Sequence, residues 1–105
     1  LVTINRVESK KYPNTIYKVI TQPSQFSWYW DGKPDFPFER KVYKDCYTIA
    51  KVSIHLWESG ILKYIIRQIG LDDVLWYHNI NSRPYWMKHY NMVIRLNNHL
   101  FYKNI

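Results

Sequence analysis

The sequence predicts an α+β fold in which helices pack on a small antiparallel sheet. Residues 39–59 carry apolar side chains at a spacing of three and four, which is the pattern of an amphipathic helix. Residues 74–80 and 94–102 are rich in aromatic and β-branched side chains, which favour strands. A chain of 105 residues can bury one modest core, so we expect a single domain over residues 1–105.

The first third of the chain predicts short elements separated by turns. Residues 1–8 carry apolar side chains on one side, as in the last turns of a helix, and Pro13 marks a loop after them. Residues 16–20 are expected to begin a short strand. Large aromatic residues alternate with other side chains over 26–31, which predicts a strand with two different faces that ends at the turn before Gly32.

The middle of the chain predicts two helices. Pro34 and Pro37 indicate an irregular connection before the first helix, at 39–59. Gly60 should end that helix, because glycine readily adopts the left-handed conformation found after helix ends. A second, shorter helical segment is expected over 61–69.

The last third predicts strands. Residues 74–80 indicate one strand and residues 94–102 a last one, with a break at Arg83 and Pro84 between them. No repeat or low-complexity tract interrupts the chain, so the aromatic strands are expected to gather in one small sheet.

The chain is strongly basic. Its formal net charge is +7 at pH 7, which favours association with polyanions such as nucleic acid or the anionic bacterial wall. The basic residues are spread along the chain, and charge alone does not choose between these partners. No apolar run approaches the ~20 residues of a membrane span, so we expect none, and we recognise no signal peptide.

The sequence offers little for metal or cofactor chemistry. The four histidines lack paired metal-ligand spacing, and the single Cys46 can form no internal disulfide. Three scattered glycines do not make a phosphate-binding loop. A nucleophilic triad could be assembled from Ser27, His78 and Asp31, but no nucleophile elbow accompanies it. We therefore expect no metal and no cofactor.

Polar residues embedded among aromatic rings are the most informative feature. Aromatic residues make up 18% of the chain, and polar groups stand beside them at 5–6, 25–27, 77–78, 84–86 and 99–102. A sugar polymer needs this combination, because pyranose rings offer C–H faces for stacking and hydroxyls for hydrogen bonds. The same rings could instead stack nucleobases or form the core of the domain.

These groups occur in the order of a known family. The sequence contains NRV at 5–7, YPNTI at 12–16, QFSW at 25–28, LWYH at 75–78, PYW at 84–86 and NHLFY at 98–102. In this order they resemble the SleB-type cell wall hydrolases, the bacterial spore-cortex-lytic family, over nearly the whole chain. The resemblance implies a lysozyme-like α+β domain that cleaves peptidoglycan glycan strands, as a lytic transglycosylase or a muramidase, during bacterial or phage lysis of the cell wall.

The matched motifs also imply the site. By their positions in the motifs, six side chains are candidates for binding the substrate: Gln25, Ser27, Tyr77, His78, His99 and Tyr102. In the family the catalytic acid is a Glu in a segment that resembles Glu-Ala-Arg-Gly-Glu and precedes the Asn-Arg-Val helix. We therefore expect that Glu before Leu1, and an N-terminally incomplete domain here, because Glu8 follows the motif.

Two other functions stay open. Without the acid, the domain would be a non-catalytic peptidoglycan-binding module that holds glycan strands and does not cleave them. A basic nucleic-acid binder would use the same charge and rings, but the ordered motifs explain the aromatic positions better, so we expect no specific nucleic acid as partner. Either wall function implies action at the bacterial cell wall, outside the cytoplasm or after delivery by lysis or a virion.

One departure from the family pattern bears on the backbone. Asn97 replaces the Gly that usually stands two residues before the closing histidine. Asparagine tolerates left-handed backbone better than most residues, so we expect the change to be mild.

Overall fold

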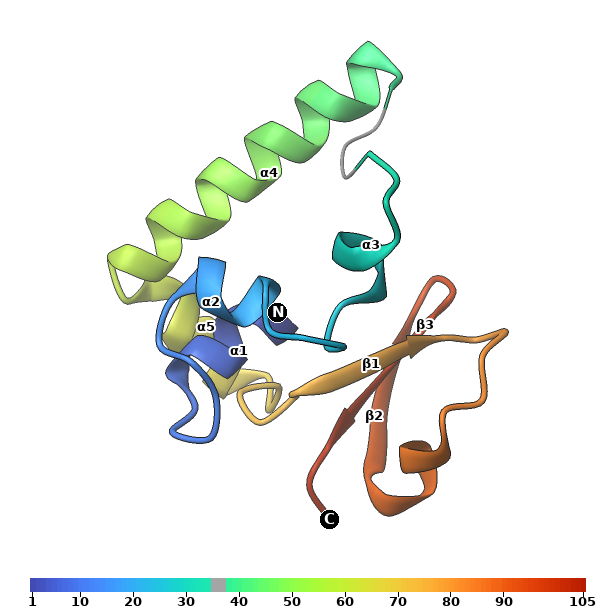
Figure 1. The fold of residues 1–105 in the computed structure, drawn as a ribbon. Helices are drawn as coiled ribbons and strands as arrows, with labels where there is room; N and C mark the ends of the chain where they lie inside the picture. The colour runs from blue at the N-terminus through green and yellow to red at the C-terminus, as the bar shows by residue number, and fades with distance from the viewer. Residues whose placement is uncertain (35–37) are drawn as a thin grey trace. The chain divides into compact units, whose positions relative to one another are not determined.

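A computed structural model describes residues 1–34 and 38–105 and confirms the α+β fold. Pro37 lies outside the described residues. In chain order the elements are α1 (Val2–Glu8), α2 (Ile16–Ile20), α3 (Ser27–Trp30), α4 (Arg40–Glu58), α5 (Ile61–Gln68), β1 (Trp76–Asn79), the 3-10 helix η1 (Tyr85–His89), β2 (Asn91–Leu96) and β3 (His99–Lys103) (Figure 1). They belong to two compact units: residues 1–22 with 72–105, and residues 23–71.

The sheet belongs to the first unit. Its strand order is β1-β3-β2, and both strand pairs are antiparallel, so β3 lies in the middle (Figure 1). The prediction of a strand within 74–80 is confirmed by β1. The prediction of a single strand over 94–102 is wrong, because the chain reverses at Asn97 and Asn98 and forms a hairpin of β2 and β3. Asn97 has a φ of 52°, the left-handed conformation that this residue tolerates.

Helix α1 confirms the helix predicted over residues 1–8 and is attached to the chain just before β1. The side-chain amide of Asn5 donates a hydrogen bond to the carbonyl of Val74 at 2.9 Å. Nε of Arg6 donates to the carbonyl of Leu75 at 2.8 Å. Because Asn5 and Arg6 are buried, these bonds satisfy polar groups that water does not reach.

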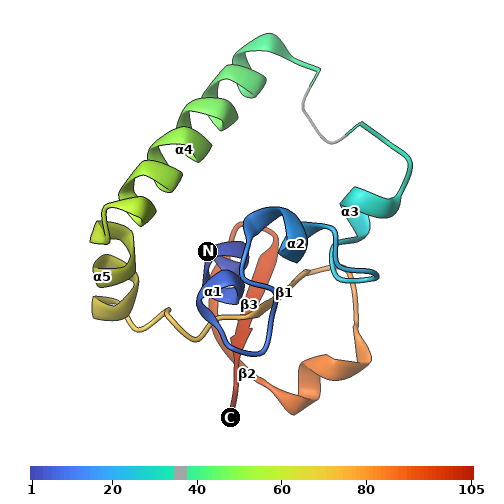
Figure 2. The same cartoon turned by 60° about the vertical axis from the view of Figure 1, so that its left-hand side comes forward.

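The short strand expected at 16–20 is wrong, because this segment forms α2. Oγ1 of Thr15 accepts a hydrogen bond from the backbone N–H of Lys18 at 3.2 Å, which is the bond of a helix N-cap. Val19 is fully buried on this helix. Helix α2 packs against α1, and Figure 2 shows the two side by side.

In the second unit the strand expected over 26–31 is also wrong, because Ser27–Trp30 form the single helical turn α3. The rings of Trp28 and Tyr29 lie 6.2 Å apart between centroids, and those of Tyr29 and Trp30 lie 5.2 Å apart. In a strand, side chains that follow each other point to opposite faces, so such contacts would not form. Contacts between consecutive aromatic rings therefore favour the helical turn over a strand.

The helices predicted at 39–59 and 61–69 are confirmed by α4 and α5. Gly60 separates them with a φ of 83°, which explains why the first helix ends there. The two helices pack against each other. The buried apolar side chains of this unit include Phe26 and Ile66, whereas no residue of α4 is buried. Across the described residues, no helix combines the length and apolar character that a membrane crossing requires.

Candidate functional site

The sheet distributes four of the predicted site residues over two faces. Tyr77 lies opposite Phe101, His78 opposite Leu100, and Asn79 opposite His99. Directly opposed residues in an antiparallel pair point to the same face, and successive residues alternate between faces. Tyr77 and His99 therefore share one face, whereas His78 and Tyr102 share the other.

We call the first of these the Tyr77 face, and it consists of the side chains of Tyr77, Asn79, His99 and Phe101. The rings of Tyr77 and Phe101 are stacked, with centroids 5.7 Å apart and an angle of 21° between planes. The ring of His99 lies 5.7 Å from that of Tyr77. The three rings are partly exposed, and Asn79 is exposed. The result is a row of aromatic surfaces that ends in an amide.

Helix α1 brings a positive charge to this face. The guanidinium of Arg6 lies over the ring of Tyr12, with 4.7 Å from its central carbon to the ring centroid. Burial lowers the pKa of Arg6, while electrostatic interactions with Tyr12 and Tyr77 oppose that shift. An arginine in this setting stays protonated, because its ordinary pKa lies far above neutral pH. The interaction with Tyr77 therefore places a fixed cation near the aromatic row.

The opposite face is covered by rings from η1 and the residue after it. Trp86 makes edge contacts with His78 and Tyr102, at 5.6 and 5.4 Å between centroids. Tyr90 stacks on Trp76 at 3.8 Å and also contacts Trp86. His78 and Tyr102 are buried under these rings. This face is therefore a packed interior.

The buried imidazole of His78 has defined hydrogen bonds at both nitrogens. Nδ1 lies 2.8 Å from the carbonyl oxygen of Asn79, and Nε2 lies 2.8 Å from the hydroxyl of Tyr102. Because a carbonyl has no hydrogen to give, Nδ1 is the donor, and in the neutral ring Nε2 accepts from Tyr102. The hydroxyl of Ser82 donates to the same Asn79 carbonyl at 3.0 Å. The network fixes the tautomer of His78 and its ring orientation.

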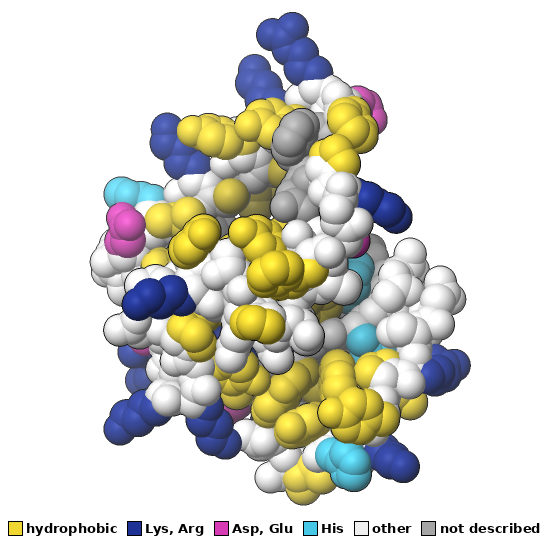
Figure 3. Space-filling model, in the orientation of Figure 1, with side chains coloured by type: hydrophobic (Ala, Val, Ile, Leu, Met, Phe, Trp, Pro, Cys, Tyr) yellow, Lys and Arg dark blue, Asp and Glu magenta, His cyan; other side chains and the backbone are white. Residues whose placement is uncertain are grey.

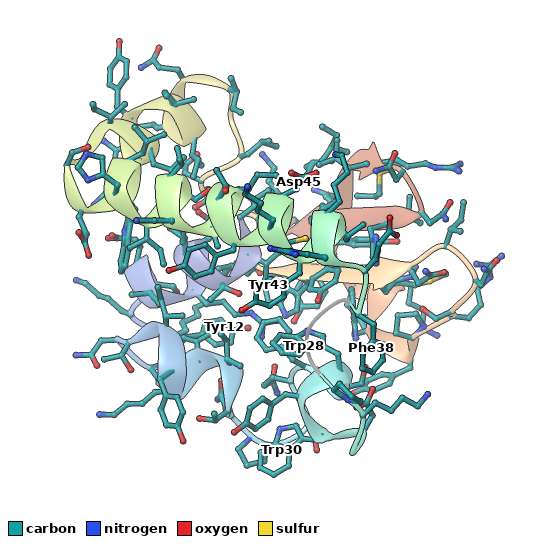
Figure 4. All side chains as sticks on the ribbon, turned by 90° about the horizontal axis from the view of Figure 1, so that it is seen from above. Tyr12, Trp28, Trp30, Phe38, Tyr43 and Asp45 are labelled. Carbon is teal, nitrogen blue, oxygen red and sulfur yellow. The ribbon has the colours of Figure 1, made fainter. Side chains whose placement is uncertain are left out.

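The other two predicted site residues, Gln25 and Ser27, belong to the second unit. Both side chains are exposed, and Ser27 is the first residue of α3. Phe26, between them, is buried and contacts Trp28 at 5.7 Å between ring centroids. Figure 4 shows Trp28 and Trp30 projecting from this short helix in different directions.

The carboxylates of the first unit do not lie in a protected setting. They are Glu8, Asp72 and Asp73, and all three are exposed. Within residues 1–34 and 38–105, no group of three histidine, cysteine, aspartate or glutamate side chains is arranged to hold a metal ion.

The sequence motifs do not predict Asn79 and Phe101 of the Tyr77 face, or the neighbouring Arg6, as site residues. Phe101 could have been found from strand periodicity, because it is two residues from His99 and must share its face. Arg6 stood in a matched motif, but no local pattern places a residue of the first helix beside a strand 70 residues away.

Comparison with known proteins gives one family. A family model described as Cell Wall Hydrolase matches residues 1–102, so the match includes all six predicted site residues and ends at Tyr102. No curated protein and no solved structure matches the chain.

Proposed function

We propose that this chain, which belongs to the cell wall hydrolase family, binds the glycan strands of peptidoglycan on the Tyr77 face of its sheet. The observation that carries the proposal is the contrast between the two faces. One face holds three partly exposed rings beside an exposed amide, whereas Trp86 and Tyr90 cover the other.

The side chains of the Tyr77 face suit a pyranose. The apolar face of a sugar ring can lie on Tyr77 or Phe101, whose planes are nearly parallel. The exposed amide of Asn79 and the ring nitrogens of His99 offer hydrogen bonds to hydroxyl or N-acetyl groups. In the second unit, the exposed Gln25 and Ser27 stay proposed glycan contacts by their motif positions.

The proposed role of His78 and Tyr102 is indirect. Both are buried, and their polar atoms bond to each other. They hold β1 against β3 from behind, which fixes the spacing of Tyr77 and Phe101 on the opposite face. We therefore assign them to positioning the sugar-stacking rings.

Cleavage requires a carboxylic acid placed against the glycosidic oxygen. Such an acid protonates the leaving-group oxygen as the anomeric bond breaks, and it needs a pKa raised by an apolar setting. Glu8, Asp72 and Asp73 are exposed to water, so none of the three has the apolar setting that such an acid needs. The proposed SleB-type reaction then ends in one of two ways. In a transglycosylase the 6-hydroxyl of muramic acid attacks the anomeric carbon and closes a ring. In a muramidase water attacks that carbon instead.

A non-catalytic glycan-binding module is the second candidate, and the exposure of the carboxylates of the first unit favours it. Both candidates act at the bacterial cell wall, and both require the Tyr77 face to bind glycan. They differ only in whether the bound strand is cut.

The first experiment separates binding from cutting. The chain is mixed with purified insoluble peptidoglycan, and both the co-sedimented protein and the turbidity are followed. We expect binding that Tyr77→Ala weakens about ten-fold, corresponding to the loss of one stacking ring of roughly 1.4 kcal/mol. Tyr85→Ala is the matched control, because Tyr85 is 84% exposed on η1 and should leave binding unchanged.

Products decide the reaction. Falling turbidity with new reducing ends indicates a muramidase, and falling turbidity with anhydro ends indicates a transglycosylase. Binding without either change supports the non-catalytic module. Equal binding by the protein and its Tyr77→Ala variant would contradict the proposed site.

A further inference from the structure

Helix α4 presents a long exposed surface that has no role in the proposed function. None of its residues from Arg40 to Glu58 is buried, and all from 40 to 52 are exposed. Several Lys and Arg side chains project at the top of Figure 3, where α4 begins in the orientation of Figure 1.

Three cations lie along one side of this helix. At 3.6 residues per turn, Arg40, Lys44 and Lys51 fall within about 40° of one another around the helix axis. Arg40 and Lys51 are about 16 Å apart along that axis, given a rise of 1.5 Å per residue. In the part of the chain that the structure describes, none of the three has a salt-bridge partner. We call Arg40, Lys44 and Lys51 the α4 basic row.

Two tyrosines border the α4 basic row. The rings of Tyr43 and Tyr47 stack one helical turn apart, with centroids 6.5 Å apart and planes at 20°. They are 47% and 60% exposed, so their hydroxyl edges reach solvent beside the cations.

Between residues 40 and 51, no acidic side chain of α4 lies on the side that carries the α4 basic row. Asp45 is bonded to Lys41 at 2.9 Å, and Figure 4 shows it on a different side of α4 from Tyr43. Glu39 precedes the helix, and Glu58 comes only at its last turn. The row is therefore an uninterrupted cationic strip.

A strip of this kind fits a linear polyanion whose charges repeat along an extended chain. We propose that the α4 basic row docks the domain onto a polyol-phosphate polymer of the bacterial wall, with Tyr43 and Tyr47 offering hydroxyls to the polyol. The choice of a wall polymer over nucleic acid rests on the family match over residues 1–102 and on the proposed function. The α4 basic row and the Tyr77 face consist of different residues in different units, so variants can test the two independently.

The test uses the whole chain and a soluble poly(glycerol phosphate) as probe, with affinity measured across a range of salt concentrations. The affinity of the triple variant Arg40→Glu, Lys44→Glu, Lys51→Glu should be at least roughly ten-fold lower, because three attractive charges are replaced by repulsive ones. The slope of log affinity against log salt concentration should also become less steep by about two, because each lost phosphate contact reduces its magnitude by about 0.7.

The matched control is the triple variant Lys10→Glu, Lys11→Glu, Lys18→Glu. These lysines are exposed in the first unit, and the change in net charge is the same. The control should keep most of the affinity. Equal weakening in both triple variants would overturn the docking site, because net charge alone would then explain binding.

Two further arms decide the partner. Single-stranded DNA of the same charge should bind less tightly than the polyol phosphate, and equal or tighter DNA binding through α4 would overturn the wall-polymer assignment. Peptidoglycan stripped of phosphate polymer should bind the α4 triple variant as well as it binds the unmodified chain. If the α4 triple variant bound this stripped peptidoglycan more weakly, the two surfaces would not act independently, which would contradict the docking proposal. Weaker binding of Tyr77→Ala alone tests the proposed function and not the docking site.

Discussion

The hydroxyl of Tyr102 lies 2.8 Å from Nε2 of His78, beneath the ring of Trp86, and donates a hydrogen bond to that nitrogen when the ring is neutral. The two residues are 6% and 7% exposed, so water cannot readily replace this bond. Tyr102 lies on β3 and His78 on β1. The two strands are therefore joined by this side-chain bond as well as by backbone pairing. This bond supports the strand pair that carries the Tyr77 face.

Removing the hydroxyl should therefore weaken the fold. Tyr102→Phe leaves Nε2 of His78 buried without its donor, which should lower the free energy of unfolding by about 1–3 kcal/mol. Urea unfolding measures the change. Tyr85→Phe serves as control and should have no effect, because Tyr85 is largely exposed. A Tyr102→Phe variant as stable as the unmodified chain would show that the bond contributes nothing.

The hairpin turn should depend on the conformation of Asn97. At a φ of 52°, the Cβ of alanine lies too close to the following carbonyl oxygen. Asn97→Ala should therefore lower the free energy of unfolding by about 1–2 kcal/mol. Asn97→Gly removes that contact and should leave stability unchanged or raise it. Thermal unfolding of both variants checks the prediction. Equal melting temperatures for the alanine and glycine variants would argue against a left-handed residue here.

Helix α2 should depend on its cap. Thr15→Ala removes the acceptor for the backbone N–H of Lys18 and should lower the free energy of unfolding by about 1 kcal/mol. Thr15→Ser keeps an equivalent oxygen and should restore most of the loss. The exposed Thr48 of α4 gives a matched control as Thr48→Ala. If serine and alanine at position 15 behave alike, the cap is not what stabilises this helix.

Arg6 gives a prediction about pH. Burial lowers the pKa of this guanidinium, but arginine remains charged near neutral pH, so the unmodified chain gains no pH dependence from it. In Arg6→Lys the same burial lowers a pKa that is ordinarily about 10.4. A base with a lowered folded-state pKa destabilises the fold at low pH, and stability returns as pH rises through that pKa.

The free energy of unfolding of Arg6→Lys should thus be well below that of the unmodified chain at neutral pH, and the difference should narrow toward about pH 10. Urea unfolding at a series of pH values measures it. A difference that stays constant with pH would mean that burial does not shift the lysine pKa.

The sequence patterns predict the long helix well, whereas two of the short segments are predicted wrongly. The helix at 39–59 and its end at Gly60 were found because nineteen helical residues repeat a strong pattern. The sequence predicts strands at 16–20 and 26–31, where the structure has helical segments, because five or six residues show too little periodicity to separate the two. Their helical state depends on the Thr15 cap and on contacts between consecutive rings.

The candidate site residues come from the order of the motifs, and their role in binding stays a prediction. Motif order named Tyr77, His78, His99 and Tyr102, and strand alternation alone separates Tyr77 from His78. The separation of His99 from Tyr102 follows in the same way. What the sequence could not show is which face is covered, because that depends on how η1 folds back to place Trp86 over His78.

The most direct test of the account is to map where a soluble peptidoglycan glycan fragment binds, by following the NMR signals of individual side chains during titration. Shifts should concentrate on the ring signals of Tyr77, His99 and Phe101, with little change at the indole N–H of Trp86. Shifts centred on Trp86 and Tyr85, with the Tyr77 signals unmoved, would contradict the assignment of the glycan site to the Tyr77 face.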